Sequence, residues 1–506
     1  MIEKTIEELL CYARFHLYLD DNDVTFKRNE LLHEFNKEEP ECDPDIDIEA
    51  IRSLTTPTSL INELKSDIPT ITEEEIERVM SIITPLPSTT KDTYYSLRNE
   101  SSRKANLYLY NLMISNNYIK LDDIKKNVYW RFLEDNNSLE ITINLSKPEK
   151  DNKDIAKLKT LVSTGYPKCN LCYENEGYYG GVGKNPRSNI RVIPIKLGGE
   201  NWFMQYSPYS YYEEHAIIIN KLHTPMAVSK RTIEKELEFI EAVPDYFVGS
   251  NSDLPIVGGS ILNHEHFQGG LHIMPMMNAR TRYRLSRKGI MKTEISYLDW
   301  YNSCFLLKST DKAELINIAD FIIQVWRNYD DEAVDLISND QDGNHSTVTP
   351  ISRKVGDTYY TYIILRNNRC NDKYKDGIFH AHPEYHNIKK EGIGLIEAMG
   401  LFILPGRLQK ELSLISDIMS NSNYSVRETI INNPSLEKHL DFINGLVVKY
   451  GRTNNKEVAD EIIKMEVGKV CKNILLNTGI YKDTIDGQLG LFRLFKRLSF
   501  EVLENE

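Results

Sequence analysis

The sequence lacks any long apolar run and any leader-like start. A membrane-spanning helix needs about 20 consecutive apolar residues, and no stretch of the 506 residues supplies them. The first residues, MIEKTIEELLCYARF, carry acids where a secretory signal carries bases. We therefore expect no membrane segment, no signal peptide and a cytoplasmic location.

Positive charge is also scarce. The chain has 61 lysines and arginines against 74 aspartates and glutamates, a formal net charge of −13. This balance argues against nucleic acid or an anionic membrane as the main partner, although a local cluster can still hold a small anion. Hydrophobic residues make up 41%, which is enough for a large core and excludes wholesale disorder.

Cysteines are few for a chain of this length. There are seven, and only one pair is closely spaced: Cys11, Cys42, Cys169, Cys172, Cys304, Cys370 and Cys471. An odd number without regular spacing is typical of a reducing compartment and excludes a disulfide framework.

Helical periodicity marks both ends of the chain, and strand patterns fill the middle. Residues 1–135 have apolar residues three and four apart, as in IEELLCYARFHLYL, EEIERVMSIITPL and RKANLYLYNLMISNNYI. Residues 391–506 return to that pattern, as in LIEAMGLFI and NKEVADEIIKMEVGKVCKNIL. Between them we predict strands and one helix, SKRTIEKELEFIEAV, with the charged run SKPEKDNKDIAK as a loop leading into another helix. The predicted strands are LEITINL, RVIPI, WFMQYSPY, HAIIIN, LPIVGGSIL and TYYTYIILR. The pattern predicts an α+β core flanked by helical segments.

The stretch GGSILNHEHFQGG, residues 258–270, contains several side chains that can take part in catalysis or metal binding. In a strand, His264, His266 and Gln268 share one face, while Glu265 and Phe267 take the other. A single strand histidine is usually structural, but two beside a glutamine favour function. One histidine can act as a nucleophile that its neighbour holds, or both can bind a metal.

A Cys-x-x-Cys motif, Cys169 and Cys172, precedes that stretch. Such a pair is half of a structural zinc site, a redox pair, or chance. No thioredoxin-like βαβ pattern surrounds it, whereas His223 and His264 can complete a Cys2His2 set.

Three further features are candidates for binding. The loop NPRSNIR offers Asn185, Arg187, Asn189 and Arg191, groups that suit phosphate but are as often merely solvated. Asn251 and Asp253 lie just before the reactive stretch. A second His-x-His, His380 and His382, suggests an internal duplication in which only the first copy keeps the glutamine.

Taken together, these stretches resemble the galactose-1-phosphate uridylyltransferase family, in its longer second type found in bacteria. The resemblance spans about 215 residues in the family's order and rests on LEITINLSKPEK, CNLCYENEGYYGG, NPRSNIRVIPI, WFMQYSPYSYYEEH, GSNSDLPIVGGSILNHEHFQGG and VTPISR.

The resemblance implies a histidine-triad-like fold with two related α/β halves, which we place at residues 136–275 and 276–390. It implies transfer of UMP from UDP-glucose to galactose 1-phosphate by double displacement. By position, His266 is the nucleophile, His264 is the first histidine, and Gln268 binds the uridylyl phosphate. The family is usually dimeric, so a homodimer is also implied.

The resemblance further implies ligand sets. Zinc would be held by Cys169, Cys172, His223 and His264. A second metal site would use His345, His380 and His382, although no matching carboxylate is found. We assign substrate binding to Asn185, Arg187, Arg191, Asn251, Asp253, Gly258, Gly259 and Ser260. Two departures stand out: Glu265 replaces the family's proline, and the spacing from Ser260 to His264 is one residue longer.

Other functions stay open. A related histidine-triad hydrolase or dinucleoside polyphosphate phosphorylase is the main alternative, but such hydrolases commonly have a histidine where Gln268 stands. A non-catalytic nucleotide-sugar binder is a second alternative, and a metal-dependent oxygenase is a third.

Overall fold

The structure is a computed structural model, and it describes residues 2–41, 44–134, 136–146, 165–181, 183–422 and 424–503. Cys42 and residues 147–157 of the predicted loop and helix lie outside the described residues. Within those ranges, no helix has both the length and the apolar character that crossing a membrane requires.

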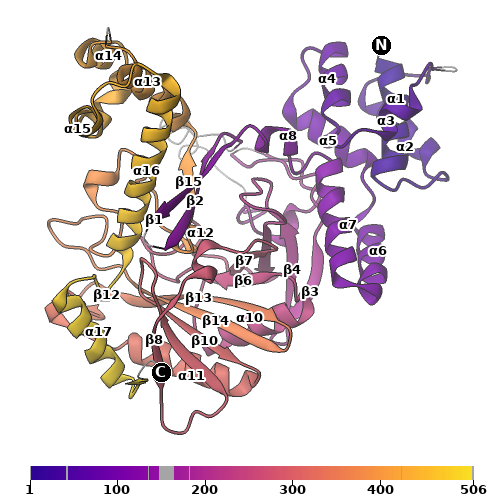
Figure 1. Cartoon of the computed structure of the whole chain (residues 1–506). Coiled ribbons are helices and arrows are strands. Elements are labelled where there is room, and N and C mark those ends of the chain that lie inside the picture. The colour runs from indigo at the N-terminus through magenta and orange to yellow at the C-terminus, as the bar shows by residue number, and fades with distance from the viewer. Residues whose placement is uncertain are drawn as a thin grey trace.

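The first part of the chain is helical, as predicted. Its helices are α1 Ile2–His16, α2 Val24–Glu34, α3 Ile48–Arg52, α4 Thr58–Asp67, α5 Glu73–Ile83, α6 Pro87–Glu100, α7 Ser102–Ser115 and α8 Leu121–Ile124. Helix α5 illustrates why they form: Thr72 and Glu75 make a reciprocal capping box, and the apolar residues at helical spacing are buried. These helices lie on one side of the molecule (Figure 1).

An eleven-stranded antiparallel sheet forms the centre. Its order is β16-β8-β9-β10-β14-β13-β6-β7-β5-β4-β3. The strands are β3 Ile193–Leu197, β4 Glu200–Tyr206, β5 Ala216–Asn220, β6 Phe247–Ser250, β7 His266–Gly270, β8 Thr281–Ser286, β9 Thr293–Leu298, β10 Cys304–Ser309, β13 Ser346–Val355, β14 Thr358–Asn367 and β16 Glu501–Val502. A small hairpin, β11 Asn339–Asp340 with β12 Gly343–Asn344, stands apart.

The sheet consists of two halves with the same topology. Each half runs through three strands, a helix and two more strands, and its last strand inserts between the third and the fourth. In the first half this gives the order β3-β4-β5-β7-β6 around α10 Lys230–Ala242, and in the second β8-β9-β10-β14-β13 around α11 Lys312–Trp326. Strands β6 and β13 join the halves. The predicted fold of two related α/β halves is confirmed, while the exact boundaries at residues 135, 275 and 390 stay a prediction.

The two faces of the sheet are covered differently. Helices α10 and α11 pack on one face, where Trp202 stacks on Phe267 with ring centroids 4.8 Å apart. Because side chains alternate along a strand, the residues on either side of Phe267 point to the opposite face. That face is closed by a second apolar cluster, which includes Tyr212, Phe247 and Ile351.

The last part of the chain is mainly helical, with α12 Leu395–Ala398, α13 Arg407–Ser420, α14 Val426–Asn432, α15 Leu440–Tyr450, α16 Lys456–Thr478 and α17 Ile485–Arg497. Helices α13–α17 lie on the side away from α1–α8, whereas α12 lies near the centre (Figure 1). Short 3-10 turns complete the chain: η1 Tyr173–Asn175, η2 Pro275–Asn278, η3 Glu332–Val334, η4 Pro383–Tyr385 and η5 Pro434–His439.

Two predicted elements are wrong. The run LIEAMGLFI is helical for only four residues; Gly400 then turns with φ +98°, and β15 Leu401–Pro405 follows. Strand β15 lies parallel to β2 Asn137–Asn144, which pairs with β1 Val128–Glu134. The run LPIVGGSIL forms turns and bends in place of a strand. Short apolar runs fit a buried strand, a helix or a packed loop equally well, which is why both predictions failed.

Gly468 in α16 provides a test of this packing. A Cβ added there would overlap the ring of Phe132 in β1, which is buried. Alanine normally stabilises a helix by about 1 kcal/mol over glycine, but overpacking costs about 1–3 kcal/mol. We expect Gly468→Ala to lower the thermal unfolding midpoint. As the control, Gly445→Ala in α15 has open space around it and should raise the midpoint; equal shifts in both variants would contradict the packing described here.

Candidate functional site

His266 is the first residue of β7 and pairs with Ile219 of β5. Its side chain is buried, and its Nδ1 lies 2.8 Å from the carbonyl oxygen of His264. A carbonyl only accepts, so Nδ1 carries the proton and Nε2 keeps its lone pair. Burial, reinforced by the neighbouring His264, lowers the pKa of His266 to about 4. The imidazole is therefore neutral at pH 7, with one nitrogen able to attack an electrophile.

Gln268 lies on the same face of β7, two residues on. Its Oε1 is 3.0 Å from Nε2 of His215, the residue just before β5. Burial lowers the pKa of His215 to about 4, so the neutral ring can donate one hydrogen bond to the amide oxygen. That bond leaves the Gln268 amide N–H groups for another partner. Sequence reasoning missed His215, whose only signal was its place at the start of the predicted strand HAIIIN.

Glu265, on the opposite face of the motif from His266, links the motif to the helix layer. Glu265 accepts hydrogen bonds from Lys235 of α10 at 2.9 Å and from the Asn220 amide at 2.8 Å. Lys235 also contacts Glu200 at 2.8 Å. Glu265 thus faces away from His266, as the alternation predicts, and ties the motif to the helix layer.

Four residues gather next to this strand. The Sγ atoms of Cys169 and Cys172 are 3.7 Å apart, and both cysteines are free. Cys169 Sγ lies 3.2 Å from His264 Nδ1, and Cys172 Sγ lies 3.2 Å from His223 Nδ1. All four ligand atoms lie within 4.8 Å of one another, so the cluster can hold a metal ion.

The orientation of His264 suits metal binding. Its Nε2 is 2.7 Å from the carbonyl oxygen of Asn220, to which it donates, and Nδ1 then faces the thiols. Burial, with the neighbouring thiol of Cys172, raises the pKa of Cys169 to about 11. A cation bound between the two sulfurs would displace that proton.

His264 therefore belongs to both sites. Its ring faces the cysteines, and its carbonyl oxygen holds Nδ1 of His266. A change in the position of His264 would move the hydrogen bond that sets the tautomer of His266.

The residues of the predicted anion-binding loop have different environments in the structure. Asn185 is exposed, and Arg187 donates to the hydroxyl of Tyr118 at 2.6 Å. Arg191 is buried, and its guanidinium donates to the backbone carbonyls of Pro85, Ser188 and Ile190. These bonds give Arg191 a structural role, and its predicted substrate contact stays a prediction.

Asp253 likewise has a structural role. Its carboxylate accepts from the backbone N–H of Val228 at 2.9 Å, from Arg327 at 2.8 Å and from the hydroxyl of Thr347. Because Arg327 and Thr347 belong to the second half, Asp253 braces the two halves. Both carboxylate oxygens already accept hydrogen bonds inside the protein, and substrate binding by Asp253 stays a prediction.

The remaining predicted binding residues form one folded loop. Asn251 is buried, and its Oδ1 accepts from the backbone N–H of Leu395 at 2.9 Å. Gly258 bridges to Ser252, and a Cβ on Gly259 would come within 2.8 Å of the Asn251 amide. Ser260 is exposed. Glycine is needed at 258 and 259 for this close approach, while substrate contact by Asn251, Gly258, Gly259 and Ser260 stays a prediction.

The second predicted metal site does not form. His345 Nδ1 lies 2.9 Å from the amide of Asn368, His380 Nε2 accepts from the backbone of Ile393, and His382 Nε2 lies 3.0 Å from the carbonyl of Ile378. Across the described ranges, the only metal-ligating group of three or more is the Cys169, Cys172, His223 and His264 cluster. The three histidines each contact different neighbours, so the structure does not bring this predicted ligand set together.

The second His-x-His is also not the counterpart of the first. By topology the strand equivalent to β7 is β14. His380 and His382 follow β14, in the segment before η4. The duplication thus exists in the fold, but the two histidine pairs do not correspond.

Known proteins of one family match this chain along most of its length. Family models described as the N-terminal and C-terminal domains of galactose-1-phosphate uridyl transferase match residues 27–225 and 238–419. A galactose-1-phosphate uridylyltransferase of Caldanaerobacter subterraneus subsp. tengcongensis is 40% identical over 514 residues, 98% of each chain. Its relative in Clostridium acetobutylicum is 39% identical over 496 residues, 96% of this chain and 98% of the relative. Among solved structures, yeast Ap4A phosphorylase Apa2 matches 64% of this chain and 85% of its own, with 10% identity and a TM-score of 0.30.

Proposed function

Because the chain belongs to the galactose-1-phosphate uridylyltransferase family, we propose that it moves the uridylyl group of UDP-glucose to galactose 1-phosphate through a covalent intermediate on His266. The observation that carries this mechanism is the hydrogen bond from His266 Nδ1 to the carbonyl of His264. That bond leaves Nε2 unprotonated in a buried, neutral ring, which is the form that attacks phosphorus.

In the first step, Nε2 of His266 attacks the α-phosphorus of UDP-glucose. A P–N bond forms, the P–O bond to glucose 1-phosphate breaks, and glucose 1-phosphate leaves with the electron pair. No base is needed because Nε2 has no proton to lose. The ring becomes positively charged, and the carbonyl of His264 stabilises the N–H that bears part of that charge.

In the second step, a phosphate oxygen of galactose 1-phosphate attacks the same phosphorus. The P–N bond breaks, UDP-galactose leaves, and His266 returns to its neutral form with Nδ1 still protonated. The Gln268 amide N–H groups, fixed by the His215 contact, would donate to the phosphoryl oxygens in both steps.

We also propose that the four-residue cluster holds zinc. Two thiolates and two imidazoles are a zinc ligand set, with tetrahedral geometry. For Zn–S bonds of about 2.3 Å a tetrahedron places the sulfurs about 3.8 Å apart, close to the 3.7 Å between Cys169 and Cys172. Zinc there would supply structural cross-linking, tying residues 169–172 to His264. The homodimer and the cytoplasmic location stay predictions.

The test of transfer is to supply UDP-glucose with and without galactose 1-phosphate. We expect multiple turnovers to UDP-galactose and glucose 1-phosphate with the acceptor. Without it we expect one equivalent of glucose 1-phosphate per active site and little free UMP. Rapid net release of UMP without acceptor would favour a hydrolase, and steady turnover with inorganic phosphate a phosphorylase; either result would refute transfer as the main activity.

A further inference from the structure

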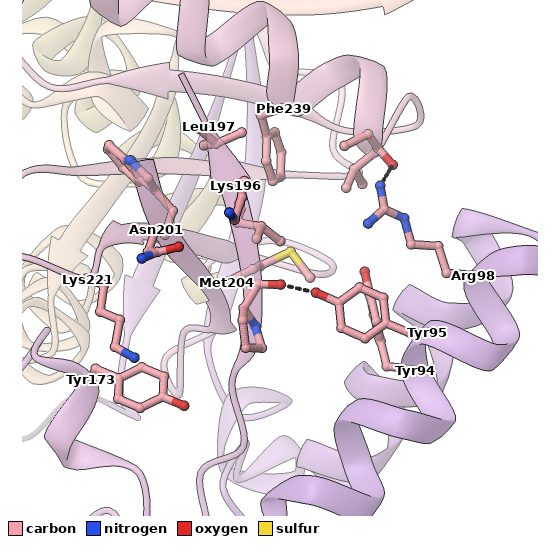
Figure 2. Close-up of a pocket in the computed structure, with 15 residues that line it drawn as sticks. Tyr94, Tyr95, Arg98, Tyr173, Lys196, Leu197, Asn201, Met204, Lys221 and Phe239 are labelled. Carbon is pink, nitrogen blue, oxygen red and sulfur yellow. Dashed lines mark hydrogen bonds between the residues drawn. The ribbon is translucent and has the colours of Figure 1, made fainter. Parts of the chain in front are cut away.

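A cavity lies at the edge strand β3 and draws on both faces of the sheet: Trp202 shares the face of Phe267, while Asn201, one residue before it, shares the face of His266. Its volume is about 390 Å³, and its walls come from α6, η1, β3, β4 and the end of α10. Figure 2 shows Lys196, Asn201 and Lys221 on one side of it and Tyr95 on another. None of its lining residues is among those predicted for catalysis or metal binding.

One side of this cavity has positive charge without a balancing acid. Lys196 and Lys221 line it, and no aspartate or glutamate does. Among the described residues, neither lysine forms an ion pair. Lys221 Nζ lies 4.3 Å from the ring centroid of Tyr173. The nearby carboxylate of Glu176 is already bound by Lys91 and by the backbone N–H of Val192. This side therefore suits an anion.

The other walls are apolar and aromatic. Met204, Phe239 and Val243 form part of them. The ring of Tyr95 is held at the edge because its hydroxyl donates to the carbonyl of Pro194, a bond drawn in Figure 2. Such walls suit a flat ring, which gains both apolar burial and stacking. They offer few hydrogen-bond partners for the hydroxyls of a sugar, which argues against a simple sugar phosphate.

We propose that this cavity binds a nucleoside monophosphate, separately from the uridylyl-transfer site. The phosphate would lie between Lys196 and Lys221, and the base would lie at the edge of β3 against the ring of Tyr95. The volume is in the range of small-ligand pockets, about 300–1,000 Å³. The exposed amide of Asn201 is available to the ligand beside the two lysines.

The test counts bound UMP by equilibrium dialysis on the full chain. We expect two UMP per chain in the wild type, of which UDP-glucose displaces one. The variant Lys196→Glu/Lys221→Glu should lose at least tenfold in affinity at the second site and still form the uridylyl adduct with UDP-glucose. A control with the same charge change, Lys288→Glu/Lys410→Glu, alters exposed lysines outside the cavity and should keep both sites.

A second variant separates the nucleotide from a bare anion. Tyr95→Ala should weaken UMP at this site and leave the binding of inorganic phosphate unchanged. One UMP per chain in every protein, or inorganic phosphate competing as well as UMP does, would overturn the proposal. If the proposed uridylyl transfer is wrong, the adduct will be missing in all variants. The two lysine double variants will still differ in their affinity for UMP at the second site.

Discussion

Replacing His266 by alanine is expected to abolish the covalent uridylyl adduct and to lower kcat by at least about 10³-fold, since loss of a nucleophile removes the covalent route entirely. Among the described residues, the neighbouring His264 is not free to substitute for it. His264 presents Nδ1 to the cysteines and donates its other N–H to Asn220, so neither nitrogen is free to attack. His215 donates to Gln268.

The measurement is the intact-protein mass after mixing with UDP-glucose. The wild type should gain the mass of one UMP and lose it when galactose 1-phosphate is added. The control is His382→Ala, which removes a histidine from the other His-x-His pair and should keep the adduct. If the adduct persisted in His266→Ala, the nucleophile would lie elsewhere; binding without an adduct in the wild type would indicate direct transfer or a binder.

The candidate site shows which predictions a sequence supports. The shared face of His266 and Gln268 follows from the two-residue period of a strand, a local rule that needs no tertiary information. The same rule placed Glu265 on the far side, where it meets Lys235. The metal cluster did not follow from any such rule, because Cys169 and His264 are 95 residues apart. The Cys-x-x-Cys motif and the downstream histidines made the set a possibility, and the family resemblance implied it.

What the sequence could not show has a common cause. Asp253 and Arg191 carry the right chemistry for a substrate, but their contacts come from distant elements, Arg327 and the carbonyl of Pro85. His215 became relevant only because β5 lies beside β7. Short apolar runs were ambiguous for a similar reason: β15 is a strand because β2 is there to pair with it. The local sequence pattern predicts which face of a helix or strand is polar. The neighbours in the folded chain decide which polar side chains already have hydrogen-bond partners.

Loss of the metal cluster should have the largest effect on stability. Cys172→Ser removes one ligand with almost no change in volume, so it leaves no cavity and isolates the contribution of metal binding. A metal that binds only the folded chain, at 1,000 times its Kd, stabilises it by about 4 kcal/mol. We expect the variant to lose its zinc, measured by elemental analysis, and to unfold at a clearly lower temperature.

The control is Cys370→Ser, because Cys370 is exposed and outside the cluster; it should keep both metal and unfolding temperature. Wild type stripped by a chelator should resemble Cys172→Ser and recover when zinc is returned, whereas the variant should not. Activity should fall with the metal because His264 both belongs to the cluster and holds Nδ1 of His266. Full metal content in Cys172→Ser, or full adduct formation in the stripped wild type, would show that the two sites are not linked through His264.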